Sequence, residues 1–173
     1  MVVTHLHPDH LHPDNLRATD APVFTVGQVA EQLATDAPDV AERTTTLPAG
    51  AAFDVGVPVR AVGELHNVIH PELPQPYNSG YLMTFGDQVV YHPGDALALP
   101  EVPVNVLLCP SSAPWLRSEM AIEFVRAVGA PRNLAIHDRV YSEAGHGFLT
   151  MQMQTLVGPR GQEWLRIADG ADL

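Results

Sequence analysis

Residues 4–10 read THLHPDH, and four side chains in this short run can bind a metal ion: His5, His7, Asp9 and His10. Because residues i and i+2 of an extended segment point the same way, His5 and His7 can face one ion. The proline after His7 turns the chain, so Asp9 and His10 can face a second point beside the first. Two divalent ions about 3.5–4 Å apart, sharing a water and a carboxylate, would use all four side chains. Imidazole and carboxylate together suit zinc, and also manganese or iron.

The composition is that of a globular chain of 173 residues, 46% of them hydrophobic. This length and apolar content predict a single domain, residues 1–173, with its own core. The 20 acidic residues outnumber the 9 basic ones, and the net charge of -11 repels phosphate backbones, which disfavours nucleic-acid binding. The sequence contains neither a membrane-spanning apolar stretch nor the pattern of a signal peptide. Together with the single cysteine, Cys109, this favours a cytoplasmic location.

Prolines and glycines divide the chain into short segments, which favours strands and loops over long helices. Strand character is found in residues 1–6, 43–65, 80–95, 104–110 and 133–138. Residues 80–95 predict a hairpin, because two apolar arms flank the turn-forming pair Gly86-Asp87. Residues 23–36 predict a strand end followed by a helix.

The clearest helical pattern covers residues 118–131. Ser118 is the expected N-cap, and Gly129 and Pro131 are expected to stop the helix. A second helical segment is expected around Met151. Early strands followed by strand-helix-strand units predict a mixed α/β (α+β) architecture.

The further metal-binding candidates also follow strands. His66 comes after VRAVGEL, Asp95 after VVYHPG and His137 after NLAI, as His5 comes after VVT. Strand ends are the rigid positions from which an α/β sheet presents a site, so we expect these side chains to converge. His70 is the alternative to His66, but it is followed by a proline and does not end a strand directly.

The order H-x-H-x-D-H, distant His, Gly-Asp after a strand and final His after a strand resembles the metallo-β-lactamase-fold superfamily. The stretches GYLMTF…VVYHPGD, VNVLLCP and AIHD are most similar to the branch of metal-dependent hydrolases related to ascorbate-6-phosphate lactonase. The resemblance runs from residue 2 to about residue 148. It implies an αββα sandwich and a pair of metal ions.

Carried over residue by residue, the resemblance implies two metal sites. The first would be held by His5, His7 and His66. The second would be held by Asp9, His10 and His137. Asp95 would bridge the two ions, and Asp9 would also orient the nucleophile, so both carboxylates are candidate catalytic residues.

Two departures from the superfamily pattern affect the expectations. Several strands usually precede the His/Asp motif, so we expect a sandwich that lacks part of its N-terminal strands. The exposed sheet edge or apolar face that results would need cover, which predicts a homo-oligomer, a dimer in the simplest case. The second departure is Ala96, where many relatives have threonine after Gly-Asp; this would change a hydrogen bond near the metals, not the metal ligands.

Other polar residues have weaker claims to a role. His146, Trp115, Arg117, Tyr77 and Asn78 are possible pocket residues, each with an ordinary structural alternative. The remaining candidates are expected to be structural or solvated: His12, His92, Cys109, Ser111 and Ser112.

The leading hypothesis is a dinuclear metal-dependent hydrolase acting on a small ester, lactone or phosphoester. Two divalent ions sharing one water would lower its pKa from about 15.7 toward neutrality, which makes a bridging hydroxide available at pH 7. One alternative is a metal-binding relative without catalytic activity. A nuclease is the third possibility, which the acidic composition disfavours.

Overall fold

The structure is a computed structural model that describes residues 1–63, 65–168 and 170–171. The chain divides into two compact units. Unit 1 comprises Met1–Tyr81 and Pro93–Ala98, and unit 2 comprises Leu82–His92 and Leu99–Leu173. The helices and strands, in chain order, are α1 (Pro13–Leu16), β1 (Val23–Thr25), α2 (Gly27–Asp36), α3 (Pro38–Ala41), β2 (Thr44–Thr46), β3 (Ala52–Asp54), β4 (Pro58–Val62), β5 (Gly80–Phe85), β6 (Gln88–His92), β7 (Val106–Pro110), α4 (Ser118–Val128), β8 (Arg132–Ile136), α5 (Glu143–Leu156), the 3₁₀ helix η1 (Gly158–Arg160) and β9 (Glu163–Leu165).

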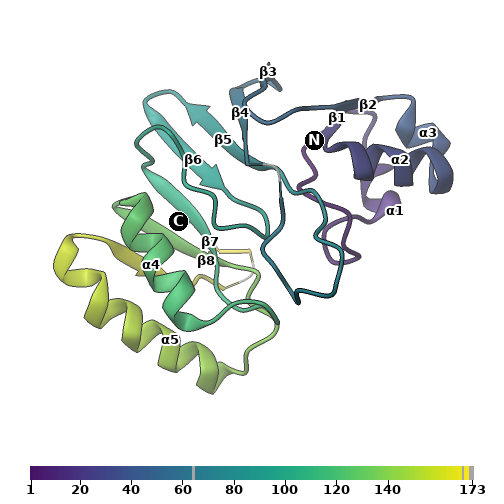
Figure 1. The fold of residues 1–173 in the computed structure, drawn as a ribbon. Coiled ribbons are helices and arrows are strands. Elements are labelled where there is room, and N and C mark those ends of the chain that lie inside the picture. Colours follow the sequence, from purple (N-terminus) through teal and green to yellow (C-terminus); the bar gives the residue numbers. More distant parts are fainter. Residues whose placement is uncertain (64, 169, 172–173) are drawn as a thin grey trace. The chain divides into compact units, whose positions relative to one another are not determined.

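Unit 1 has an apolar core between its short helices and a parallel pair of strands, β1 and β2 (Figure 1). The predicted helix after β1 is confirmed as α2, whose residues Val29 and Leu33 are fully buried. Their spacing of four residues places both on the same face of the helix. The helix ends before Pro38, which cannot continue its hydrogen-bond pattern.

The N-terminal stretch joins this core with less strand structure than the sequence predicts. Val2 forms an isolated parallel bridge with Phe24, and the amide of Val3 donates to the Phe24 carbonyl. The prediction of a strand over residues 1–6 is therefore wrong beyond this bridge. The backbone turns away because the Val3 carbonyl accepts from two side chains, the hydroxyls of Thr25 (2.9 Å) and Tyr81 (2.8 Å).

The α2 core makes a direct stability prediction. Leu33→Ala should lower the free energy of unfolding by about 2–5 kcal/mol, because it removes a fully buried side chain and leaves a cavity. Urea denaturation of the metal-free protein measures this change. Glu31→Ala, on the exposed side of the same helix, is the matched control and should stay within about 0.5 kcal/mol of the parent. Equal effects of the two substitutions would contradict the burial of this face.

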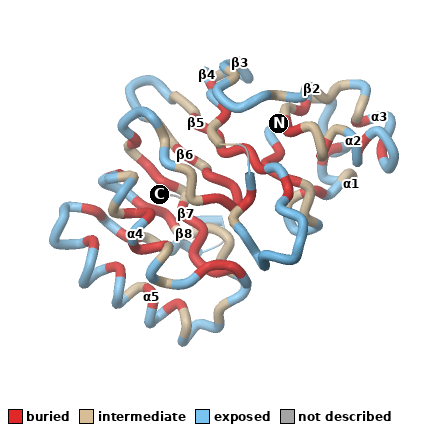
Figure 2. Tube along the Cα trace, viewed as in Figure 1, coloured by how far each residue is buried: buried red, intermediate tan, exposed pale blue. Residues whose placement is uncertain are grey.

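Unit 2 is a sheet in the order β5-β6-β7-β8-β9, within which β6 to β9 run parallel. The predicted hairpin is confirmed, because β5 ends at Phe85 and β6 begins at Gln88 across the turn at Gly86-Asp87. Helices α4 and α5 lie along one face of this sheet (Figure 1). Buried residues follow β7 and β8 and the inner sides of the helices (Figure 2). The fully buried Cys109 on β7 is part of this core, as expected, and burial raises the pKa of its thiol.

The start of α4 corrects one prediction. Arg117, in extended conformation, occupies the N-cap position, and Ser118 is the first helical residue. The expected stop is confirmed at Gly129, which adopts the left-handed conformation (φ 74°) that glycine tolerates best. The helix buries Ile122, Phe124 and Val125, so its apolar face lies against the unit 2 core.

The sheet flanked by helices confirms the predicted mixed α/β fold. Within the described ranges, 1–63, 65–168 and 170–171, no helix combines the length and apolar character that a membrane span requires. The single domain, the missing N-terminal strands and the dimer stay predictions.

Candidate metal centre

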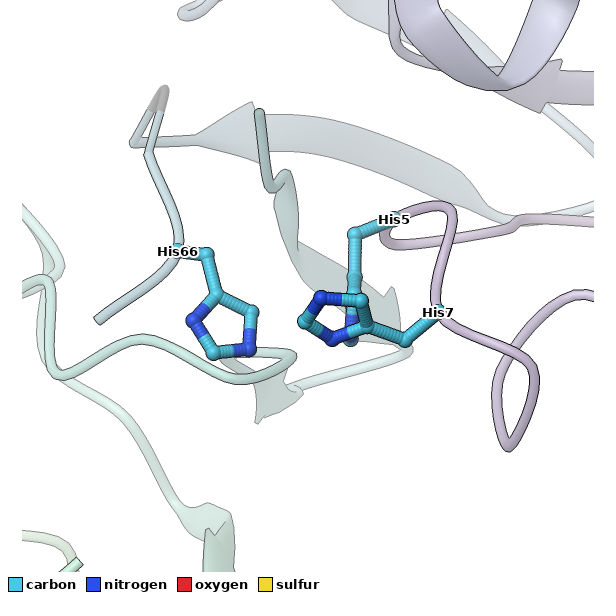
Figure 3. Close-up of side chains that lie close together, drawn as sticks. All are labelled: His5, His7 and His66. Atoms are coloured by element: carbon cyan, nitrogen blue, oxygen red, sulfur yellow. The ribbon is translucent and has the colours of Figure 1, made fainter. Parts of the chain in front are cut away.

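Four imidazole rings of unit 1 pack against one another: His5, His7, His10 and His66. We call them the histidine cluster. Ring centroids lie 4.1 Å apart for His5 and His10, 4.7 Å for His5 and His7, and 4.9 Å for His5 and His66. The rings of His7 and His66 are 4.7 Å apart. Figure 3 shows His5 and His7 on the N-terminal loop facing His66 from another segment. The predicted meeting of these side chains is confirmed within unit 1.

His5 is the buried centre of the cluster, with none of its surface exposed. Its Nδ1 lies 3.0 Å from the Thr4 hydroxyl, and its Nε2 lies 3.1 Å from His7 Nδ1. Burial, followed by the charge of nearby His10, lowers the pKa of His5 to about 2. The ring is therefore neutral, which is the form of imidazole that binds metal.

His66 is held so that one particular nitrogen faces the cluster. Its Nδ1 lies 2.6 Å from the backbone carbonyl of Asn67. A carbonyl can only accept, so Nδ1 carries the proton, and in the neutral ring Nε2 offers a lone pair. The backbone amide of His66 donates to Pro76 O at 2.9 Å, which fixes the segment itself. A ring nitrogen bound to a backbone carbonyl is the usual second contact of a metal-binding histidine.

The Asp95 carboxylate lies between two members of the cluster. It is 3% exposed, with Oδ1 3.4 Å from His10 Nε2 and Oδ2 3.4 Å from His66 Nε2. Each oxygen of the carboxylate thus faces the Nε2 of one ring of the cluster.

Asp9 and His10 form the more open side of the centre. The chain turns after His7, whose carbonyl accepts from the amides of His10 and Leu11, both at 2.9 Å. Asp9 Oδ2 lies 3.6 Å from His10 Nε2, and 62% of the Asp9 side chain is exposed, against 18% for His10. Asp9 is thus the carboxylate within reach of solvent, whereas Asp95 is enclosed.

The donor atoms of unit 1 fit divalent metal ions. Two sets have donor atoms within 4.8 Å of one another: His5, His7 and His66; and His5, His10 and Asp95. Three neutral imidazoles, or two with a carboxylate, are ligand sets typical of zinc and of other first-row metals. The buried Asp95 carboxylate supplies negative charge that a cation would neutralise.

His137 belongs to unit 2, at the end of β8. Its backbone adopts φ 51°, uncommon for a residue with a side chain, and its Nδ1 lies 2.6 Å from Ser112 O. The Ser112 amide (3.1 Å) and hydroxyl (2.9 Å) both donate to His137 O. His137 therefore shows the same carbonyl-bound Nδ1 as His66. Its place among the metal ligands stays a prediction.

The other candidates take the ordinary roles that their surroundings suggest. His70 and His12 are exposed, and Arg117 is 76% exposed beside Glu119. His146 is buried in α5 and its Nε2 lies 2.7 Å from the Asp138 carbonyl. The hydroxyl of Ser111, like that of Ser112, donates to a backbone carbonyl.

Sequence reasoning missed three residues that contact the candidate ligands. Thr4 and Asn67 directly flank His5 and His66. The polar Thr4 side chain is a signal for a contact of this kind, whereas Asn67 contacts His66 through its backbone carbonyl, which the residue type does not reveal. Asn78, considered only as a pocket residue, is fully buried and accepts from the Asp95 amide at 3.0 Å. Because 17 residues separate the two, no local pattern reveals this contact.

The chain matches both a family model and a known protein sequence. The family model described as "Beta-lactamase superfamily domain" matches residues 1–137. Protein Rv0786c of Mycobacterium tuberculosis (strain ATCC 25618 / H37Rv) is 34% identical over 155 residues, which cover 85% of this chain and 70% of that protein.

Comparison with solved structures shows the same kind of fold. Igni18, a metallo hydrolase from the hyperthermophilic archaeon Ignicoccus hospitalis, superimposes with a TM-score of 0.72 at 15% identity, covering 98% of this chain and 76% of that one. CmlA, a diiron β-hydroxylase from Streptomyces venezuelae, gives a TM-score of 0.68 at 14% identity, covering 96% and 43%. At these identities the likeness shows the fold alone.

Proposed function

The chain belongs to the beta-lactamase superfamily, and from this premise we propose that it is a metal-dependent hydrolase with two divalent ions, acting on a small molecule. This family membership agrees with the resemblance that the His/Asp motif of residues 5–10 indicated. The narrower resemblance to the ascorbate-6-phosphate lactonase branch stays a prediction. The substrate class and the pair of ions are likewise parts of the proposal.

One observation carries the proposal: the enclosed Asp95 carboxylate lies between His10 and His66, 3.4 Å from an imidazole nitrogen on each side. A carboxylate with one oxygen toward each of two ligand groups is suited to bridge two cations. We propose that His5, His7 and His66 hold the first ion, and that Asp9 and His10 contribute to the second. From the superfamily resemblance, His137 would complete the second set.

A bound pair of divalent ions would lower the pKa of water and supply positive charge that polarises the oxygen under attack. The chain's own residues then have distinct tasks. The Thr4 hydroxyl contacts Nδ1 of His5 and the Asn67 backbone carbonyl contacts Nδ1 of His66, and these contacts fix the ring orientations. Asp9, the solvent-accessible carboxylate, would accept a proton from the attacking water and orient it toward the substrate.

The imidazole-rich donor set favours zinc, with manganese or iron as alternatives. CmlA shows that this fold also occurs in a diiron enzyme. The choice among metals depends on supply and on geometry as well as on ligand type.

Among the three candidate substrate classes, unit 1 favours a neutral ester or lactone over a phosphoester. Recognition of phosphate usually relies on arginine or lysine, and the chain contains no lysine. Two of the three arginines of unit 1 are engaged elsewhere. Arg17 pairs with Asp14 and Asp39, and Arg43 donates to the carbonyls of Leu16 and Ala21. The third, Arg60, lies on β4 in the hairpin with β3.

Turnover assays on metal-loaded protein test this proposal. A neutral aryl ester and a simple lactone should be hydrolysed at least about tenfold faster, by kcat/KM, than an aryl phosphodiester at the same pH. A faster phosphodiester reaction would overturn the substrate class. Absence of turnover for all three, in protein shown to hold two ions per chain, would overturn the hydrolase and support the non-catalytic alternative.

A further inference from the structure

The turn that carries Asp95 is held by one buried side chain from a distant part of the sequence. Asn78 has none of its surface exposed. Its Nδ2 donates to Pro93 O at 2.9 Å, and its Oδ1 accepts from the Asp95 amide at 3.0 Å. One amide group therefore bonds both ends of the three-residue turn Pro93-Gly94-Asp95, and it uses both a donor and an acceptor to do so.

The middle of this turn fits against the same amide. Gly94 adopts φ +65°, and a Cβ added there would lie 2.2 Å from Asn78 Oδ1 and 3.0 Å from Thr4 Cβ. A side chain at position 94 would thus displace Asn78 and press on the residue that bonds His5. Glycine is required at position 94 by this close approach as well as by the backbone conformation.

The backbone on both sides of Asn78 is tied to the segments that carry the histidines. The Ser79 amide donates to Thr4 O at 2.9 Å, and Pro76 O accepts from the His66 amide at 2.9 Å. Asn78 therefore lies where the His5, His66 and Asp95 segments meet. A shift of the Asn78 side chain would therefore move Asp95 relative to the histidine rings.

We propose that Asn78 is a positioning residue for Asp95: its amide fixes the turn so that the carboxylate stays between His10 and His66, and this sets the affinity for the second ion. The inference rests on the proposed two-ion function. The second ion is the more sensitive one, because the first keeps three imidazoles, those of His5, His7 and His66, when Asp95 moves.

The test measures metal binding, independently of turnover. Apo protein is titrated with Zn²⁺ by calorimetry, and with Mn²⁺ followed by electron paramagnetic resonance, which detects spin coupling between bridged ions. In Asn78→Ala the affinity for the second ion should fall by about 10–100-fold and the coupled Mn²⁺ signal should weaken, because a supporting contact of a ligand is lost. The affinity for the first ion should stay within about threefold.

A matched control separates the loss of Asp95 positioning from the general effect of removing a buried amide side chain. Asn133 in unit 2 is also fully buried, and its Nδ2 donates to the carbonyls of Ala130 (2.9 Å) and Glu163 (3.0 Å). Asn133→Ala should therefore reduce the free energy of unfolding to a similar extent while leaving both ion affinities unchanged. Gly94→Ala disturbs the same turn from its other side and should weaken the second ion as Asn78→Ala does; because the added Cβ also presses on Thr4, the first ion can weaken too.

The outcomes distinguish this inference from the proposed function. Failure of the parent protein to bind two ions overturns the proposed function. Two ions in the parent, with unchanged affinities and coupling in folded Asn78→Ala, overturn the inference alone. If Asn78→Ala does not fold, folded Gly94→Ala decides: a weakened second ion supports the inference, and parent-like binding overturns it.

Discussion

Replacing Asp95 by alanine is expected to reduce kcat/KM of the metal-loaded protein by about a thousandfold or more, because the carboxylate proposed to bridge the two cations is lost. The substitution removes a 3%-exposed carboxylate that lies between His10 and His66 and leaves the four imidazoles in place. Metal analysis of the same sample should show fewer ions per chain than in the parent. Steady-state kinetics on the best neutral ester or lactone measure the effect.

The control for this substitution is Asp20→Ala, which removes an exposed carboxylate from the same unit and should leave kcat/KM unchanged. Unfolding of the metal-free Asp95→Ala protein checks that it still folds. Retention of turnover within about tenfold of the parent, in folded and fully loaded Asp95→Ala, would contradict a bridging role for this carboxylate.

Removal of metal is the second large effect. Dialysis against a chelator should abolish turnover completely and lower the free energy of unfolding, since ions that bind only the folded chain stabilise it by mass action. At a free ion concentration a thousand times Kd, each ion bound should add about 4 kcal/mol to the stability of the apo protein. Denaturant unfolding with and without the ion measures this difference.

Readdition of zinc, manganese or iron, each alone, should restore both turnover and stability. The extent of recovery ranks the three metals. Asp95→Ala provides the internal comparison, because its stability should respond less to added ion than that of the parent. Metal analysis should confirm that the chelated protein holds less than about one-tenth of an ion per chain. Turnover that survives in such protein would show that the reaction does not depend on the metal centre.

The elements that local patterns specify were predictable from the sequence. The hairpin around Gly86-Asp87 follows from a turn pair between two apolar arms, and α2 follows from the spacing of Val29 and Leu33. The meeting of His5 with His7 was predictable from their i, i+2 spacing. The place of His66 was predicted from a strand end, but β4 ends four residues earlier, at Val62. The choice of His66 over His70 rested on the same reasoning, and His70 is exposed.

The features that depend on distant contacts were not predictable. The N-terminal residues look like a strand, but the Val3 carbonyl bonds the side chains of Thr25 and Tyr81, 22 and 78 residues away. Asn78 reads as an ordinary loop residue until the fold brings it to the turn that carries Asp95. At α4, serine favours the N-cap in general, yet the extended backbone at Arg117 makes that residue the N-cap, so the helix starts one residue earlier than expected.

The central claim is that His5, His7, His66, Asp9, His10, His137 and Asp95 hold two divalent cations. Anomalous diffraction from crystals of the metal-loaded protein, recorded on both sides of the metal absorption edge, tests it most directly. The account predicts two peaks, one contacted by His5, His7 and His66 and one by Asp9, His10 and His137, with Asp95 touching both. A histidine cluster without a peak, or a single ion with Asp95 turned away from it, would contradict the claim.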